Sequence, residues 1–319
     1  MKNFNIRIIL LILLFILSLT LALNHGSVKL NFLELFLKEN RPILYLRILR
    51  ILLGIIAGAG LTVSGVVMQA ILKNPLAEPY LLGTSSGAGL GAVLAIVLGF
   101  SGLFLPLSAF IGAISTTILV YQIAREDNRL PIQSLILAGV IVSLVLSGII
   151  ILLIYTSPKQ VMHGIFWWLW GSLSNYDLKP LILVTVIVVS AISLIFLFWK
   201  DLNAISIGEE EAIHLGIDVE KVKKILFILV SLITSSIVCV SGIIGFVGLI
   251  IPHIIRFAFG SNHKRLIPLS AILGAAFLVF SDMLARTLIS PLEIPIGVIT
   301  AFLGAPIFIF LLKGKQKIT

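Results

Sequence analysis

The clearest chemical pair within the long apolar stretches of this sequence is Asp282 and Arg286. A carboxylate inside an apolar helix can couple transport to a proton or sodium gradient, so an ion-driven carrier would depend on Asp282. Arg286 follows four residues later, on the same face of a helix, where the two side chains can form an ion pair. We therefore expect a structural pair here, and we expect a partner subunit to supply the energy for any transport.

Other catalytic patterns are missing from the sequence. No Gly-x-x-x-x-Gly-Lys-Ser/Thr stretch is present, so the chain has no P-loop for ATP. The five histidines lack metal-ligand spacing, no Ser/His/Asp arrangement is visible, and the one cysteine, Cys239, lies in an apolar run. We predict neither an enzyme nor a bound cofactor or metal. His253 is expected to be a structural histidine, and Glu293 receives no chemical role.

The composition places the chain in a membrane. Hydrophobic residues make up 59% of the 319 positions and charged residues 12%, with a mean hydropathy of +1.17. A soluble domain carries about 25% charged residues, so a water-facing surface cannot be built here. We predict an all-α membrane protein. The net charge of +9 does not indicate nucleic-acid binding, because lysine and arginine gather in the cytoplasmic loops of membrane proteins.

Nine apolar runs and one short segment are candidate spans. The short segment, 252–260, cannot cross about 30 Å of hydrocarbon, but a short helix inside a protein is tolerated at that depth. We therefore predict about ten transmembrane helices in a single domain, residues 1–319, with the first run kept as an uncleaved helix. The runs lie at about 6–23, 43–72, 84–100, 104–124, 131–155, 181–199, 224–250, 267–289 and 295–312.

Ten helices place both termini on one side of the membrane. With both termini in the cytoplasm, fifteen of the 23 lysines and arginines fall inside and eight outside, in agreement with the positive-inside tendency. The most charged interruption, residues 201–224, is then cytoplasmic. We predict that its Glu-Glu-Glu stretch forms a short surface helix ending at Gly216, followed by a second short helix. The predicted location is the cell (inner) membrane.

The sequence also repeats itself in order. Five helices, an odd number, separate the copies, so the repeat at about 45–156 and 225–313 should be inverted across the membrane. Inverted repeats are typical of transporters, because two halves that exchange shapes give alternating access. The matches are Val63-Ser64-Gly65 with Val240-Ser241-Gly242, the following Pro75 and Gly83 with Pro252 and Gly260, Pro106–Ala113 with Pro268–Ala275, and Gly139–Ile141 with Gly297–Ile299.

Together these motifs resemble the FecCD-type permeases of ATP-binding-cassette (ABC) importers for iron complexes and vitamin B12. The resemblance covers about residues 40–312. It implies a homodimer, or a pair of homologous permeases, with two ABC ATPase subunits inside and a substrate-binding protein outside. The stretches that carry it are Arg47–Arg50, Ser64–Gln69, Lys73–Pro79 with Leu82-Gly83, Trp170–Leu173, Gly208–Ala212 with Leu215-Gly216, Gly242–His253 with Arg256, Asp282 with Arg286, and Glu293–Gly297 through Pro306.

The same resemblance assigns roles to three sets of residues. The helices that couple to the ATPase would include Gly208, Glu209, Glu210, Glu211, Ala212, Leu215 and Gly216. Outward-facing arginines that pair with glutamates of the binding protein would be Arg47, Arg50 and Arg286. The cytoplasmic gate would contain Asn74, Pro75 and Leu76, with a second gate region near Pro131 and Ile132.

The resemblance suggests a ferric siderophore as cargo, because this is the family's commonest one, with haem, cobalamin and molybdate as alternatives. An ion-coupled secondary transporter that uses Asp282 is the alternative of another class. A membrane-embedded enzyme is disfavoured because no cluster of polar residues is evident, and a structural or signalling protein is disfavoured by the inverted repeat. The expected partners are other subunits and membrane lipid, without nucleic acid.

Overall fold

The computed structural model describes residues 2–28, 30, 33–127, 130–174 and 177–315. This part of the chain contains helices and no strand, as the sequence predicts. The helices are α1 (Lys2–Asn24), η1 (Glu34–Phe36), η2 (Lys38–Asn40), α2 (Arg41–Ile71), η3 (Pro79–Leu82), α3 (Thr84–Val97), α4 (Phe104–Ala124), α5 (Ile132–Thr156), α6 (Lys159–Leu169), α7 (Leu178–Leu197), α8 (Trp199–Ile207), α9 (Glu209–His214), α10 (Val219–Ser241), α11 (Val247–Phe259), α12 (His263–Thr287) and α13 (Ile296–Lys315).

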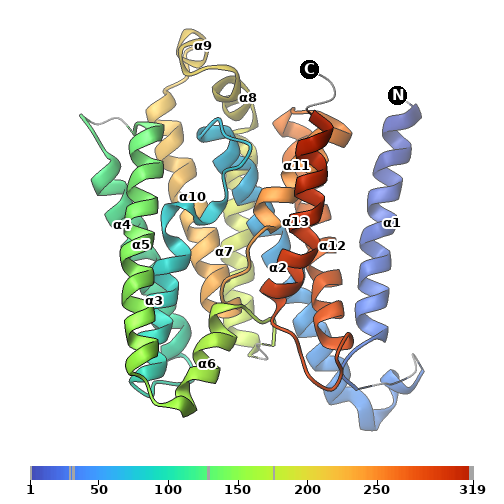
Figure 1. Ribbon diagram of the computed structural model, residues 1–319. Coiled ribbons are helices and arrows are strands. Elements are labelled where there is room, and N and C mark those ends of the chain that lie inside the picture. Colours follow the sequence, from blue (N-terminus) through green and yellow to red (C-terminus); the bar gives the residue numbers. More distant parts are fainter. Residues whose placement is uncertain (1, 29, 31–32, 128–129, 175–176, 316–319) are drawn as a thin grey trace.

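Ten of the described helices correspond to the ten predicted spans. Seven are long and apolar enough to cross a membrane alone, namely α1, α2, α4, α5, α7, α10 and α12. Three shorter apolar stretches complete the set, namely α3, α11 and Ile296–Ile309 of α13. Both ends of the chain lie on one side of the molecule, together with α8 and α9 (Figure 1). We call this the terminal side and the opposite one the distal side.

The boundary between α10 and α11 differs from the prediction of one run over 224–250. The helix ends at Ser241, and α11 begins only at Val247. Gly242 and Phe246 both have positive φ angles, 67° and 71°. A side chain at Gly242 would collide with the Trp168 carbonyl, so glycine is required there. The short segment predicted at 252–260 is therefore the second half of a 13-residue helix.

Two short helices outside the spans were also predicted differently. The residues after Gly216 do not form a separate short helix, because Asp218 caps α10 by accepting a hydrogen bond from Lys221 N at 3.1 Å. The second helix of this region is instead α8, which precedes α9. The sequence reading missed α6 on the distal side, whose 11 residues are too few to make a span.

The two copies of the repeat run in opposite directions, as predicted. In Figure 1, α2 to α5 and α10 to α13 each form a set of four helices, and corresponding members point to opposite sides of the molecule. α2 packs on α12, and α10 packs on α4, so the first helix of each set contacts the third of the other. One sequence match is not equivalent in space, because Pro75 follows α2 in a loop whereas Pro252 lies inside α11.

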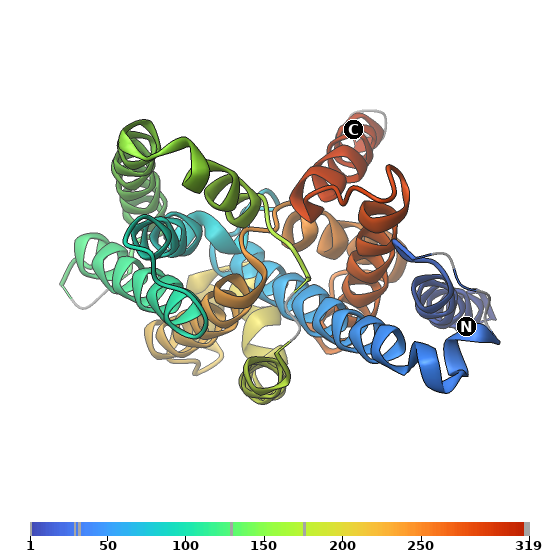
Figure 2. The same cartoon turned by 90° about the horizontal axis from the view of Figure 1, so that it is seen from below.

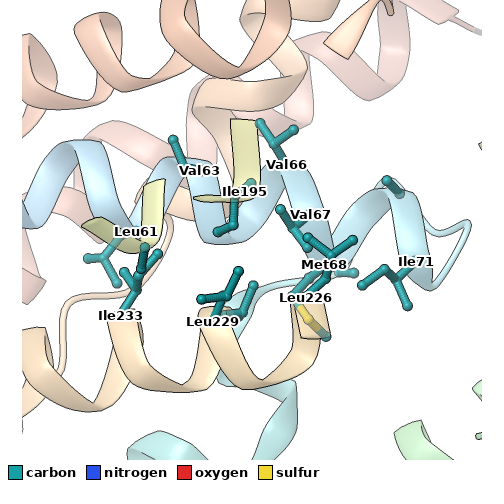
Figure 3. Packing of buried hydrophobic residues seen from close by; sticks show 14 of the residues in the cluster. Leu61, Val63, Val66, Val67, Met68, Ile71, Ile195, Leu226, Leu229 and Ile233 are labelled. Atoms are coloured by element: carbon teal, nitrogen blue, oxygen red, sulfur yellow. The ribbon is translucent and has the colours of Figure 1, made fainter. Parts of the chain in front are cut away.

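The core forms around α2, which crosses the middle of the molecule between the α3–α6 and α11–α13 groups (Figure 2). Its buried side chains pack against α7 and α10 (Figure 3). On another face, glycines bring backbones together: a methyl group on Gly58 would meet the backbone of Gly274, and one on Gly65 would meet Gly248. Such contacts between small residues are a usual way to pack helices in membranes.

Candidate functional site

The α8–α9 region forms a projecting helical knob on the terminal side (Figure 1). Ala212 and Gly208 are buried and hold α9 against the body. Three large apolar side chains point to the surface, with exposed fractions of 77% for Ile207, 60% for Ile213 and 71% for Leu215. Such exposed apolar side chains at one projecting place are typical of a surface that meets another protein.

The charged residues of the knob divide into two groups. Glu210 and Glu211 are exposed, beside the apolar side chains. Glu209 is turned inward, and its Oε2 lies 2.8 Å from Nζ of Lys223 on α10. Gly216 has a φ of 80°, which ends α9 and returns the chain to α10. The predicted coupling residues are therefore brought together, and Glu209 is the one that contacts α10.

The predicted gate residues form a tight turn directly after α2. Oδ1 of Asn74 accepts a hydrogen bond from Leu76 N at 2.9 Å, and its carbonyl accepts one from Ala77 N at 3.0 Å. This side-chain turn holds Leu76 outward, where its exposed fraction is 51%. In the second predicted gate region, Pro131 is the N-cap of α5 and Ile132 is its first residue.

Glu78 is a candidate site residue that the sequence analysis did not single out. Its Oε1 accepts a hydrogen bond from Phe246 N at 2.7 Å, at the break between α10 and α11. The hydroxyl of Tyr80 accepts a longer bond, 3.4 Å, from Ile244 N in the same break. Burial raises the pKa of the Glu78 carboxyl, while the bond from Phe246 acts in the opposite direction. A glutamate inside the apolar Leu76–Leu82 stretch was the available signal, and it links the gate turn to the broken helix.

The predicted docking arginines are turned inward in this structure. The exposed fractions are 4% for Arg47, 5% for Arg50 and 3% for Arg286. Nε of Arg286 lies 3.0 Å from Oδ2 of Asp282, which confirms the predicted pair. Because their side chains are buried, a docking role for these arginines would require them to leave their present partners, and that role stays a prediction.

Arg50 is the centre of this group, which we call the distal clamp: Arg47, Arg50, Asp282, Arg286 and Glu293. Nε of Arg50 donates to both oxygens of Asp282 at 2.8 and 3.0 Å, and Nη1 donates to both oxygens of Glu293 at 3.0 and 2.9 Å. Glu293, which had no role from the sequence, also accepts from the Ser27 hydroxyl at 3.0 Å.

The distal clamp also holds the end of α1. Arg47 donates to the carbonyls of Leu23 at 2.6 Å and Val28 at 2.7 Å, and Arg286 donates to that of Ala22 at 3.2 Å. Carbonyls at the end of a helix have no partner within it, and cations there are favourable. The clamp therefore joins α1, α2, α12 and the connection before α13 into one unit.

Among the described residues, no three His, Cys, Asp or Glu side chains come together as a metal site would need. The His253 ring packs edge-on against Phe308, with a centroid distance of 6.4 Å. In the described residues, ten apolar helices that include an inverted repeat of two four-helix sets, a break between α10 and α11 and a projecting knob are the features of a multi-pass membrane permease. The chain belongs to the FecCD transport family, whose match extends over residues 10–314.

Two curated relatives and one solved structure are similar along most of the chain. The hemin transport system permease protein HmuU of Yersinia pestis is 36% identical over 97% of this chain and 95% of its own length. The cobalamin import system permease protein BtuC of Halobacterium salinarum is 37% identical over 85% and 73%. A metal-chelate type ABC transporter in an inward-facing conformation is 34% identical, with a TM-score of 0.88 over 95% and 97%. The chain is thus a permease subunit of the ABC transporter type, the subunit type that lacks the ATPase site.

Proposed function

We propose that this chain lines the translocation pathway of a ferric siderophore importer, in which two ABC ATPase subunits contact the α8–α9 knob. The observation that carries the proposal is the exposure of Ile207, Ile213 and Leu215 among carboxylates on the terminal side. An apolar centre with a polar rim fits a groove on another protein. The permease would then lie in the cell (inner) membrane with its terminal side in the cytoplasm. The excess of lysine and arginine assigned to that side supports this orientation.

The cargo proposal rests on family membership and on the metal-chelate cargo of the structural relative. At nearly equal identity, one relative is named for hemin and another for cobalamin, so overall similarity does not choose among cargoes. A ferric siderophore is the first choice, and haem, cobalamin and molybdate are the alternatives. In such an importer the binding protein outside the membrane would provide most of the selectivity.

ATPase activity in lipid tests both parts of the proposal. The purified permease is reconstituted with candidate ATPase and binding-protein partners, and ATP hydrolysis is measured with each cargo in turn. Stimulation by the binding protein loaded with ferric siderophore is the expected result. Stimulation by haem, cobalamin or molybdate instead would keep the importer and change the cargo. Failure of every ATPase to associate would contradict the proposal.

The role of the knob can be tested by truncating two exposed side chains. The double variant Glu210→Ala/Leu215→Ala is expected to lower cargo transport per ATP by about 10-fold, since truncating an anchor at the centre of an interface weakens its contact with the partner. The control is Leu13→Ala, which removes an exposed leucine from the middle of α1, away from both the knob and the distal end. Equal transport per ATP in both variants would refute the coupling role.

Docking of the binding protein would involve the distal side. If Arg47, Arg50 and Arg286 act directly, Arg47 is the one freest to do so, because its hydrogen bonds go to backbone carbonyls whereas Arg50 holds two carboxylates. Arg47→Glu is expected to weaken binding-protein docking about 10-fold at low salt, since charge pairs set docking strength and rate. Unaltered docking together with an intact fold would exclude a direct role for Arg47.

A second copy of this chain is the proposed occupant of an apolar groove beside α13. The groove has a volume of about 370 Å³ and is lined by Trp170, Val298, Ala301, Phe302, Ala305 and Pro306. Phe302 is 75% exposed and can fill a matching groove on a symmetric partner. Phe302→Lys should convert a dimer into monomers by light scattering in detergent, and a dimer that persists would place the interface elsewhere.

The secondary-transporter alternative is weakened by the surroundings of Asp282. Its carboxylate is 2% exposed and lies between two guanidinium groups, of Arg50 and Arg286. A carrier that loads a proton or sodium ion needs a carboxylate that can exchange its partner during each cycle. The alternative predicts transport without ATP that collapses with the ion gradient, whereas the importer predicts none.

A further inference from the structure

A buried lysine lies beneath the knob, outside every role assigned so far. Lys223 is 2% exposed, and its Nζ lies 2.8 Å from Oε2 of Glu209 on α9 and 3.3 Å from Oε1 of Glu220 in the first turn of α10. We call these three residues the Lys223 triad. Its first contact ties the knob to α10, because Glu209 is the residue with which α9 begins.

The triad continues to a second element, the connection between α4 and α5. The other oxygen of Glu220, Oε2, accepts a hydrogen bond from Leu130 N at 2.9 Å. Leu130 is buried and directly precedes Pro131, whose carbonyl accepts from Leu135 N at 3.0 Å in the first turn of α5. One ionic and hydrogen-bonded path therefore runs from α9 through Lys223 and Glu220 to the start of α5.

The form of the triad suits a movable joint better than a static anchor. A buried ion pair contributes little net stability compared with apolar packing, although breaking one by removing a partner is costly. Lysine is a point charge on a flexible stem, so it can keep contact with two carboxylates while they shift. Space for movement is present as well, since a cavity of about 380 Å³ is lined by the triad together with Leu130, Pro131, Ile132 and Gln133.

We propose that the Lys223 triad transmits displacement of α9 to the start of α5, so that Lys223 is a positioning residue for opening and closing of the pathway. This inference rests on the proposed function, in which an ATPase moves α9. The start of α5 is the second gate region expected from the sequence. The triad joins α9 to this region through charged groups.

The first test measures the link in the permease alone. Hydrogen–deuterium exchange is followed in the segment 130–135 for Lys223→Met and for the matched controls Lys221→Met and Lys224→Met, which alter exposed lysines of the same helix. Loss of Lys223 should speed exchange in this segment at least about 5-fold, because Glu220 is no longer held. The controls should stay within about 2-fold of the unaltered chain, and an equally slow exchange in Lys223→Met would overturn the link.

The second test measures coupling in the reconstituted complex with its ATPase and binding protein. Lys223→Met should lower transport per ATP at least about 5-fold while the ATPase still binds, and Lys223→Arg, which keeps the charge, should restore it to within about 2-fold. A purely structural role would lower stability and leave transport per ATP unchanged, which would overturn the inference.

If Lys223→Met does not fold, Glu209→Gln carries the same prediction, because the Glu209 carboxylate is partly exposed and glutamine has the same shape as glutamate. An ATPase that never binds the unaltered chain would refute the proposed function, while the exchange experiment still decides on the link.

Discussion

The distal clamp and the Lys223 triad are two buried charge groups at opposite ends of the molecule, and they differ in kind. In the clamp, Nε and Nη1 of Arg50 each face both oxygens of a different carboxylate, Asp282 and Glu293, and Arg50 and Asp282 are at most 5% exposed. In the triad, one lysine meets two carboxylates whose side chains are 31% and 35% exposed. A planar guanidinium held by two carboxylates fixes geometry, whereas a lysine between two partly hydrated carboxylates tolerates movement. The comparison separates a rigid distal end from an adjustable terminal end.

The largest expected effect comes from removing the carboxylate at the centre of the clamp. Asp282→Ala leaves two buried guanidinium groups without their shared partner, and we expect a loss of about 3–5 kcal/mol of stability. Thermal unfolding in detergent measures it, with Glu39→Ala as an exposed control. A loss below about 1 kcal/mol would mean that the clamp is not rigid in the sense proposed.

Exchanging arginine and lysine between the two groups should give the next largest difference. Arg50→Lys cannot hold Asp282 and Glu293 with four bonds, so we expect a loss of about 2–3 kcal/mol. Lys223→Arg should cost less than about 1 kcal/mol, because both carboxylates remain in reach of a cation. Thermal unfolding of the two variants in the same detergent measures the two losses of stability. Equal losses would erase the distinction between fixed and adjustable groups.

A smaller effect is expected when one contact of the triad is removed. Glu209→Gln should change stability by less than about 1 kcal/mol, since its carboxylate is partly hydrated and Glu220 still pairs with Lys223. The same variant should nevertheless lower transport per ATP, as argued above. A large loss of stability without loss of coupling would reverse the assignment and make Glu209 a structural anchor.

Raising the salt concentration should produce the smallest difference between the distal clamp and the Lys223 triad. Raising ionic strength from about 0.05 to about 0.5 M shortens the screening length several-fold and weakens exposed pairs more than buried ones. Exchange in the segment 130–135 should therefore quicken slightly with salt, whereas exchange around Glu293 should not change. If exchange in the two segments responded equally to salt, the distal clamp would be more hydrated than its burial suggests.

The sequence predicted the number of spans well because each is marked by apolar length and charged punctuation. Asp282 and Arg286 were predicted as a pair from their spacing alone. The helix break at Gly242–Phe246 was missed because no charged residue interrupts that apolar run after Lys224. Hydropathy responds to side chains, whereas this break arises from backbone φ angles and from carbonyl contacts at glycine.

Contacts between segments that are distant in the chain could not be predicted from the sequence. Glu293 lies 243 residues from Arg50, and Glu78 lies 168 residues from Phe246. Nothing in a single sequence relates such positions, so Glu293 had no role and Glu78 was overlooked. For the same reason, the inward orientation of Arg47 and Arg50 depends on helices α1 and α12, which pack there only in the folded chain.

The short helices have a consequence for how the chain enters the membrane during synthesis. α3 has 14 residues and α11 has 13, so each is roughly 20 Å long at 1.5 Å per residue, well short of the hydrocarbon thickness of about 30 Å. If either helix entered the lipid alone, its two ends could not both reach water. Each must be inserted together with a longer neighbour, so that α3 with α4 and α11 with α12 form helical hairpins that leave the translocon as units. Lengthening of the loop before α4 or α12 would then impair biogenesis before it could affect the finished transporter.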